Sequence, residues 1–203
     1  FENIDFTIRE VKRIGKHAQG TIAYTTSPVH NLNTWLDLAK KIEDAGADSL
    51  AIKDMAGLLR PFDAYELVKN LKSTLSIPIH MQTHATTGMS TATNMKAIEA
   101  GIDNIDTSIS SLSMTYGHTA TETMLAIFEN QEREINLDLS ALEEVSIFFK
   151  EIRDKYSEFE GNLKGVDSSM LVKQVPGGMF SNLESKLRAN KQEDKIDLVK
   201  DEI

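Results

Sequence analysis

Ala45-Gly-Ala-Asp-Ser-Leu-Ala-Ile-Lys53 shows how this chain is built, because it joins the end of a helix to a short apolar strand. The apolar spacing predicts an amphipathic helix from Trp35 to Ala45, and Gly46 accepts the left-handed conformation that ends a helix. A close echo, Ala100-Gly-Ile-Asp-Asn-Ile105, follows a second predicted helix from Thr93 to Ala100. This repeated order of helix, glycine and strand predicts parallel strands joined by helical crossovers.

Two more copies of the unit lie earlier in the chain or between these two. A predicted helix over residues 8–14 leads through Gly15 to a strand over residues 18–24, and a helix over residues 64–75 leads to the strand around His80. Four units would fill residues 1 to about 130, as in a (β/α)₈ barrel or a doubly wound sheet. The chain has no Gly-x-Gly-x-x-Gly turn, which favours the barrel.

Polar side chains follow the apolar strands, and the stretch Ile77-Pro-Ile-His-Met-Gln-Thr-His-Ala-Thr-Thr-Gly88 carries three of them. Successive strand residues point to opposite faces, so His80, Gln82 and His84 are expected on one face. Imidazole nitrogens and an amide oxygen at this spacing could hold a divalent cation. Glutamine is a poor zinc ligand and suits a harder ion better.

Lys53 is the second candidate, because it ends an apolar strand and is followed by Asp54. Three interpretations stay open: an ion pair with Asp54 or another acid, a Schiff-base nucleophile, or a carbamate that binds metal. Residues 54–57, Asp-Met-Ala-Gly, favour a specialised turn after the strand. Hydroxyls at Thr25, Thr26 and Ser27 could line a pocket or form an ordinary turn, and the segment Tyr116-Gly-His118 could contact a substrate or close a loop.

After residue 136 the pattern changes, and we expect two regions, residues 1–136 and 137–203. An apolar stripe predicts a helix from Leu139 to Tyr156, and a turn is expected at Pro176-Gly-Gly178. A charged helix is expected from Glu184 onward, and its charge run over residues 186–195 is interpreted as a solvated face. We interpret this second region as the start of a helical extension.

Composition narrows the functional classes. The chain has 203 residues and a net charge of −9, which argues against nucleic acid as a partner. It has no cysteine, which removes disulfide and thiolate chemistry and suits a cytoplasmic protein. No apolar run is long enough for membrane insertion. The sequence starts at Phe1 and stops within a helical pattern, so we expect it to be a piece of a longer protein.

Several stretches resemble the carboxyltransferase domain of biotin-dependent enzymes, a family that includes pyruvate carboxylase, the oxaloacetate decarboxylase alpha subunit and the transcarboxylase 5S subunit. They are Ile52-Lys-Asp-Met-Ala-Gly-Leu-Leu59, the strand around His84, and Pro176-Gly-Gly-Met-Phe-Ser-Asn-Leu183. Two others, residues 17–30 and 113–122, are more similar to the decarboxylase alpha subunit than to animal-type pyruvate carboxylase. The similarity covers essentially the whole chain.

The resemblance implies a (β/α)₈ barrel with a helical extension, and carboxyl transfer between a 2-keto acid (oxaloacetate or pyruvate) and biotin. It implies an enolate stabilised by a divalent metal ion such as Zn, Mn or Co. By this similarity Lys53 matches a carbamylated, metal-ligating lysine, and Gln82 and His84 match a pair of histidine ligands. Ser181 matches a threonine that shuttles a proton to biotin, and serine keeps the hydroxyl.

The chain departs from the family in two ways. Gln82 stands where the family has a histidine, and the family's aspartate ligand and substrate-binding arginine belong to a segment before Phe1. We therefore expect this chain to contain barrel strands five to eight and to need the missing half or an oligomeric partner. No Ala-Met-Lys-Met occurs, so biotin is expected on a carrier domain or another subunit.

Two alternatives remain beside a carboxyltransferase. The chain could be a non-catalytic assembly or scaffold piece of a biotin-dependent complex, which the loss of a histidine ligand at Gln82 favours. It could also be a class I aldolase-like barrel in which Lys53 forms a Schiff base. The direction of the reaction, whether carboxylation, decarboxylation or transcarboxylation, depends on partner subunits.

Overall fold

A computed structural model describes residues 1–132, 135–174, 177–196 and 198–199, without the side chains of residues 177, 178, 180, 181 and 193. The chain divides into two compact units. The first unit consists of Phe1–Thr83 and Ala92–Asp106, and the second of His84–Thr91 and Thr107–Ile203. The first unit contains the sheet, and the second contains the carboxyl-terminal helices.

The sheet of the first unit has four parallel strands in chain order, as the sequence predicts. They are β1 (Gln19–Ala23), β2 (Ser49–Asp54), β3 (Ile79–Thr83) and β4 (Asn104–Ile105). The fourth strand is shorter than the predicted one. On either side of it the pairing continues only as single hydrogen bonds, from Asp103 N to Ile79 O and from Asp106 N to Met81 O.

Helices connect the strands, and local signals fix their ends. The helix α2 (Leu32–Asp44) begins where the Asn31 side chain accepts a hydrogen bond from the Thr34 backbone N–H. It ends before Gly46, whose φ of +94° needs glycine. The remaining helices are α1 (Glu2–Arg13), α3 (Pro61–Thr74), which starts on a proline, and α4 (Ser90–Glu99).

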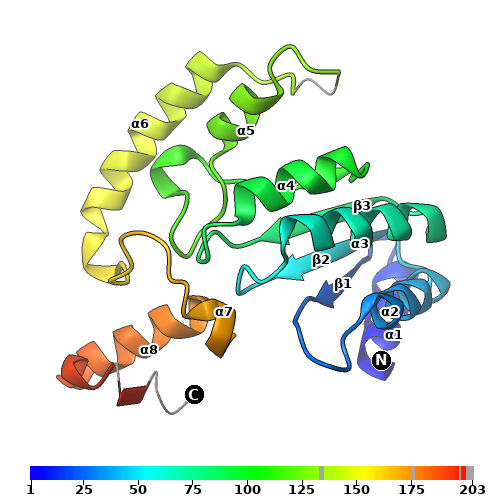
Figure 1. Cartoon of the computed structure of the whole chain (residues 1–203), viewed down its shortest axis with the longest axis horizontal. Coiled ribbons are helices and arrows are strands. Elements are labelled where there is room, and N and C mark those ends of the chain that lie inside the picture. Colours follow the sequence, from blue (N-terminus) through cyan, green and yellow to red (C-terminus); the bar gives the residue numbers. More distant parts are fainter. Residues whose placement is uncertain (133–134, 175–176, 197, 200–203) are drawn as a thin grey trace. The chain divides into compact units, whose positions relative to one another are not determined.

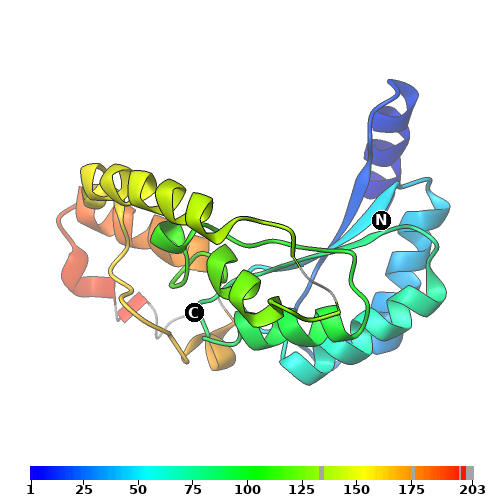
Figure 2. The same cartoon turned by 90° about the horizontal axis from the view of Figure 1, so that it is seen from above.

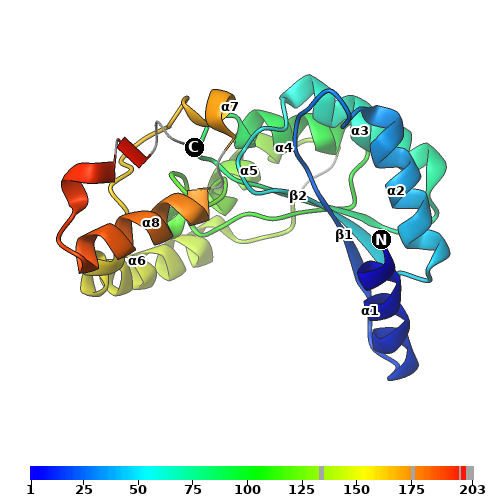
Figure 3. The same ribbon diagram turned by 90° about the horizontal axis from the view of Figure 1, so that it is seen from below.

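The core lies between one face of the sheet and the helices. Figure 1 shows α2 and α3 side by side along the strands, and Figures 2 and 3 show α1 near β1 and apart from these two helices, with its buried Ile8 in the same core. Alternate strand residues face the core, as the period of two predicts. The fully buried apolar side chains of the strands are Ile22, Leu50, Ile52, Ile79 and Met81.

The other face of the sheet is more polar and is only partly buried. Strand register places its side chains in rows across β1, β2 and β3. One row contains Thr21, Ala51 and His80, and the next row toward the carboxyl ends contains Ala23, Lys53 and Gln82. Within the first unit no described helix covers this face as α2 and α3 cover the opposite one.

Glycine at position 20 is required by the close approach of α2 to β1. A Cβ atom built on Gly20 would overlap Cγ2 of Ile42, which is fully buried. We expect Gly20→Ala to lower the free energy of unfolding by about 1–3 kcal/mol because the core must shift to accept the methyl group. Urea denaturation of the purified protein measures this.

Two controls sharpen the Gly20 experiment. Gly165→Ala adds a methyl group where no atom lies within 4 Å, and it should change stability by less than ~0.5 kcal/mol. In an Ile42→Ala background the methyl group at position 20 should cost much less, because the overlapping atom is gone. An equal cost in both backgrounds would show that the overlap is not the cause.

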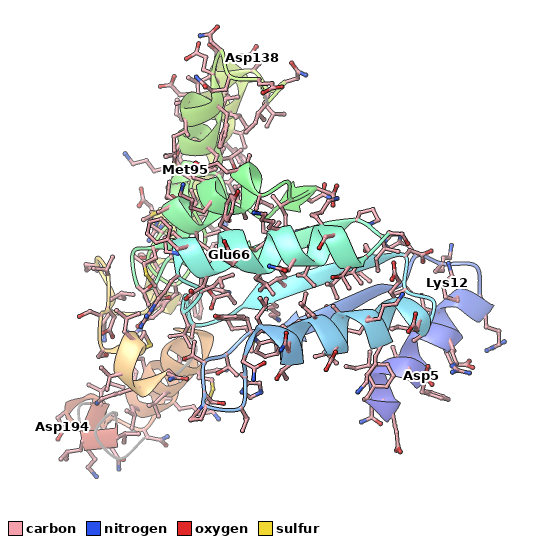
Figure 4. All side chains as sticks on the ribbon, turned by 45° about the vertical axis from the view of Figure 1, so that its right-hand side comes forward. Asp5, Lys12, Glu66, Met95, Asp138 and Asp194 are labelled. Carbon is pink, nitrogen blue, oxygen red and sulfur yellow. The ribbon has the colours of Figure 1, made fainter. Side chains whose placement is uncertain are left out.

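The second unit is built mainly from helices. They are α5 (Thr121–Phe128), α6 (Leu139–Lys155), α7 (Met170–Lys173) and α8 (Gly177–Ala189), with the 3₁₀ turns η1 (Ser110–Leu112), η2 (Ser157–Phe159) and η3 (Glu193–Lys195). Asp138, labelled in Figure 4, caps α6 by accepting hydrogen bonds from Ser140 N and Ala141 N. The predicted helix over residues 139–156 therefore agrees with α6 to within one residue.

The sequence predicts a turn at Pro176-Gly-Gly178, and for the two glycines this prediction is wrong. Pro176 lies outside the described residues, and Gly177 and Gly178 already belong to α8. The left-handed residue that ends the preceding helix is Gln174, with φ of 55°, so the break in the helix comes before the glycines. Glu184 consequently lies within a helix instead of starting one.

The described helices contain no segment long and apolar enough to cross a membrane. The charge run after Glu184 is largely solvated, since the described lysines of residues 186–195 are exposed.

Candidate functional site

Lys53 and Gln82 lie side by side where two parallel strands end. They are register partners on β2 and β3, and both side chains are partly buried on the more polar face of the sheet. Neither side chain has a hydrogen-bond or ion-pair partner among the described residues. The sequence prediction that Lys53 and Gln82 lie near the carboxyl ends of their strands is therefore confirmed in the first unit.

Asp54 does not neutralise Lys53, because neighbouring strand residues point to opposite faces. Its fully buried carboxylate accepts hydrogen bonds from Leu58 N (2.8 Å), Leu59 N (2.9 Å) and the Thr83 hydroxyl (2.9 Å). Gly57 has a φ of 67°, which lets the chain fold back over the carboxylate. The expected specialised turn is thus present, and it fixes the chain directly after Lys53.

His80 lies one row deeper in the sheet than Gln82. Its Nε2 donates to the Asp106 carboxylate at 2.6 Å, and Asp106 follows β4 in the same unit. The imidazole is therefore held by a carboxylate, and His80 has a structural partner of its own. His80 lies on the same face as Gln82, as predicted. Lys53 is paired in register with Gln82 and not with His80.

His84 belongs to the second unit, where the loop over residues 113–118 holds it. Its Nδ1 lies 2.6 Å from the Tyr116 carbonyl oxygen. A carbonyl only accepts hydrogen bonds, so Nδ1 carries a proton. The ring of His118 lies 4.6 Å from that of His84 between centroids, with the planes at 47°. The predicted Tyr116–His118 segment thus contacts a predicted site residue.

Thr26 and Ser27 line a cavity of about 300 Å³ at the end of β1, which favours the pocket over the ordinary turn for these two hydroxyls. Tyr24 packs against Trp35 with centroids 5.6 Å apart, and His30 stacks on the same indole at 4.9 Å. Sequence reasoning missed the aromatic and acidic part of this lining. Those residues are Tyr24, His30, Trp35, Asp63 and Glu66, the last of which is labelled on α3 in Figure 4.

Two tyrosines near these features are expected to ionise late. Burial, reinforced by the Asp63 and Asp54 carboxylates, raises the pKa of Tyr24 to about 12, and burial with Glu184 and Asp167 raises the pKa of Tyr116 to about 12. Both pKa values lie above the ordinary value of 10, so the stability that these hydroxyls contribute is present below pH 10 and is lost between pH 10 and 12.

Absorbance at 295 nm follows phenolate formation during a pH titration and tests this prediction. Of the four tyrosines in the chain, two should ionise only near pH 12. Tyr24→Phe and Tyr116→Phe should each remove part of that late phase. If both variants leave the titration above pH 11 unchanged, the raised pKa values are wrong.

The donors of the predicted metal site have suitable chemistry. Gln82 offers an amide oxygen, and Nδ1 of His84 is held by a carbonyl, as is usual for histidines that bind metal through Nε2. Lys53 as an ammonium cannot bind a cation, so it fits only as a carbamate, whose oxygens can. No three His, Asp or Glu side chains cluster around a possible cation among the described residues. Lys53, Gln82 and His84 therefore suit a divalent ion only if Lys53 carries a carbamate.

The side chain of Ser181 lies outside the described part of the chain, although its backbone is in α8. Its predicted role in proton transfer stays a prediction.

A parallel sheet with polar side chains at its carboxyl ends defines an α/β protein of the kind that binds ligands at that edge. Residues 1–148 match the family model described as HMGL-like, and the chain belongs to this family. The predicted resemblance to carboxyltransferase domains of biotin-dependent enzymes is confirmed by the relatives and structures to which the chain is similar.

The chain is 46% identical to the methylmalonyl-CoA carboxyltransferase 5S subunit of Propionibacterium freudenreichii subsp. shermanii over 203 residues, covering 99% of this chain and 40% of the relative. It is 43% identical to a pyruvate carboxylase subunit of Methanocaldococcus jannaschii over 202 residues, covering 99% of this chain and 36% of the relative. The chain thus spans 40% or less of these two relatives.

A solved structure of the carboxyl transferase domain of Rhizobium etli pyruvate carboxylase with pyruvate has a similar fold. The TM-score is 0.93 at 32% sequence identity, and the match covers 98% of this chain and 35% of that chain. The α/β class with a parallel sheet, predicted from the repeat, is confirmed by this match.

Proposed function

We propose that this chain is part of a biotin-dependent carboxyltransferase that moves a carboxyl group between biotin and a 2-keto acid, pyruvate or oxaloacetate. The observation that carries the proposal is the pairing of Lys53 with Gln82 at the carboxyl end of the sheet, in a chain similar to two such enzyme subunits. Among possible family members, residues 17–30 and 113–122 favour an oxaloacetate decarboxylase alpha subunit.

The proposed fold is the carboxyl-terminal half of a (β/α)₈ barrel, strands five to eight, over residues 1–136. Residues 137–203 would begin the helical extension. The partly exposed face with Lys53 and Gln82 supports a half-barrel, because all-parallel sheets are normally covered on both faces. The other half-barrel, or another copy in a homo-oligomer, would cover it. We place the protein in the cytoplasm.

In the proposed site, Lys53 as a carbamate, Gln82 and His84 would hold a divalent ion, Zn, Mn or Co. Only Thr83 separates Gln82 from His84, so chain connectivity keeps their Cα atoms within roughly 7 Å. When bound, the ion would polarise the carbonyl of the keto acid and favour its enolate. The Tyr116 carbonyl would keep His84 in the ligating tautomer.

The proposed reaction has a simple atomic balance in the carboxylating direction. A proton leaves the methyl carbon of pyruvate, a carbon–carbon bond to the carboxyl group forms, and the bond between that group and the biotin ring nitrogen breaks. The ring nitrogen then takes a proton, which the hydroxyl of Ser181 would relay. Oxaloacetate decarboxylation runs the same steps in reverse, and biotin would arrive on a carrier domain or another subunit.

The test is an oxaloacetate decarboxylation assay on the full-length protein that contains this chain, with free biotin and lactate dehydrogenase as the coupling enzyme. We expect pyruvate formation that depends on biotin and a stoichiometric metal content by elemental analysis. No turnover of oxaloacetate with or without biotin would overturn the proposal. Borohydride reduction with a keto acid should not trap Lys53, whereas an aldolase-like Schiff base would be trapped.

A second candidate is a non-catalytic assembly piece of a biotin-dependent complex. The observation that favours it is Gln82, a weak ligand at a position where the family has histidine. This candidate predicts that the wild-type protein binds no metal and that Gln82→His restores metal binding. The enzyme proposal predicts that the wild-type protein already binds metal.

A further inference from the structure

The cavity at the end of β1 has no part in the proposed carboxyl transfer. Its lining comes from the segment between β1 and α2, from α2 and from α3, all of which belong to the first unit. None of the proposed metal ligands lines it. Its volume of about 300 Å³ lies at the lower end of the range for ligand pockets, roughly 300–1,000 Å³. The cavity is therefore large enough for a small organic molecule.

The wall between β1 and α2 is held in place by its own hydrogen bonds. The hydroxyl of Ser27 lies 2.8 Å from Nδ1 of His30 and accepts from Val29 N at 3.3 Å. The Thr34 hydroxyl donates to Val29 O at 2.9 Å. The ring of His30 stacks on Trp35 with the planes at 12°. A wall that is already ordered lowers the entropic cost of binding a ligand.

The charged side chains that line the cavity are acidic. Asp63 and Glu66 lie three residues apart on α3, so they share one side of the helix, and both are exposed. Neither carboxylate has a hydrogen-bond or ion-pair partner among the described residues. No lysine or arginine lines the described part of the cavity. These two carboxylates favour a cationic ligand.

The acidic lining affects a neighbouring hydroxyl. Burial raises the pKa of Tyr24, and the negative charge of Asp63 is the next largest cause, whereas the positive charge of Arg60 has the smallest effect and acts in the opposite direction. The described residues contain no group of three His, Asp or Glu side chains that could hold a metal ion. An organic ammonium group therefore suits this lining better than a metal ion does.

Trp35 adds a hydrogen-bond donor to the same cavity. Its side chain is only 6% exposed, and its indole N–H has no acceptor among the described residues. A buried indole N–H usually has a partner, so a ligand with an oxygen acceptor would complete the site. The ring of Trp35 and the buried side chain of Leu67 offer apolar surface to the body of the ligand.

We propose that this cavity binds a small amino alcohol, an organic ammonium compound that also carries a hydroxyl oxygen. The carboxylates of Asp63 and Glu66 hold the ammonium group, the Trp35 N–H donates to the oxygen, and the apolar body lies against Trp35 and Leu67. The site goes beyond the proposed function and does not depend on it, because no proposed metal ligand lines the cavity.

Isothermal titration calorimetry of the full-length protein that contains this chain tests the proposal with three matched compounds. The first is 2-amino-1-phenylethanol, which has both groups. We expect 1-phenylethane-1,2-diol, which lacks the charge, to bind at least ~10-fold more weakly. We expect 2-phenylethylamine, which lacks the hydroxyl, to bind about 3-fold more weakly. The measurement needs no keto acid, biotin or metal, so its failure would leave the proposed function untouched.

The double variant Asp63→Asn/Glu66→Gln keeps the shape of both side chains and removes their charge. It should weaken binding of 2-amino-1-phenylethanol at least ~10-fold while its circular dichroism spectrum stays that of wild type. The matched control is Asp37→Asn, which removes an exposed carboxylate of α2 outside the cavity lining and should change binding less than about 2-fold.

The indole N–H signal of Trp35 gives a local readout by NMR, and its absence from Trp35→Phe identifies it. The signal should move with saturation by 2-amino-1-phenylethanol and move less with 2-phenylethylamine. No saturable binding of 2-amino-1-phenylethanol, equally tight binding of the diol, or wild-type affinity in the double variant would each overturn the proposal. Equal affinity for the two amines would overturn the role of the Trp35 N–H.

Discussion

Lys53→Ala is expected to lower kcat/KM for the proposed carboxyl transfer by roughly 1000-fold, because loss of the proposed metal ligand would remove several kcal/mol of transition-state stabilisation. The folded structure should persist, since Lys53 is partly exposed and has no ion-pair partner among the described residues. The free energy of unfolding should change by less than ~1 kcal/mol. Steady-state kinetics and urea denaturation of the full-length protein measure both quantities.

The variant Lys53→Arg separates a carbamate from a simple positive charge. Arginine keeps the charge but does not form the carbamate, so it should be as inactive as alanine. Added formate or acetate should restore part of the activity of Lys53→Ala by supplying an oxygen ligand. Activity of Lys53→Arg above about a tenth of wild type would rule the carbamate out.

A matched control is Lys69→Ala on the exposed side of α3. Lys69 is exposed, lies over the Tyr65 ring at 5.6 Å, and belongs to a helix and not to a strand that carries a proposed ligand. Its removal should change kcat/KM by less than about 2-fold and stability by less than ~0.5 kcal/mol. A comparable loss in both lysine variants would point to general charge instead of a specific ligand.

Asp54→Ala is expected to destabilise the protein by about 3–5 kcal/mol, because each buried donor left without an acceptor costs ~1–3 kcal/mol. Among the described residues at least three donors depend on this carboxylate: two backbone N–H groups and the Thr83 hydroxyl. Thr83 belongs to β3, so the carboxylate also joins the ends of two neighbouring strands. Urea denaturation and thermal unfolding measure the loss.

Two variants bracket the Asp54 result. Asp54→Asn keeps the shape but turns an amide N–H toward a donor, so it should cost more than ~1 kcal/mol. Asp44→Ala removes an exposed carboxylate that pairs with Lys40 at 3.0 Å, and it should cost less than ~0.5 kcal/mol. A stability of Asp54→Ala within about 1 kcal/mol of wild type would show that the turn does not depend on the carboxylate.

Much of the first unit could be predicted from sequence, because its signals are local. Strand alternation placed His80 and Gln82 on one face correctly, and glycine after the helices marked the ends at Gly46 and Gly101. The error at Pro176-Gly-Gly178 has a local cause too. Two adjacent glycines favour a turn, but the left-handed residue in the structure is Gln174, a type that seldom signals one.

The sequence by itself determined the order of helices and parallel strands and the face on which each strand side chain lies, since both follow from periodicity along the chain. Only the tertiary structure decided which groups form hydrogen bonds with these side chains. Asp54 meets Thr83 from 29 residues away, and His84 meets Tyr116 from 32 residues away. Such contacts depend on strand register and on the path of the loop over residues 113–118, and neither leaves a repeating pattern in the sequence.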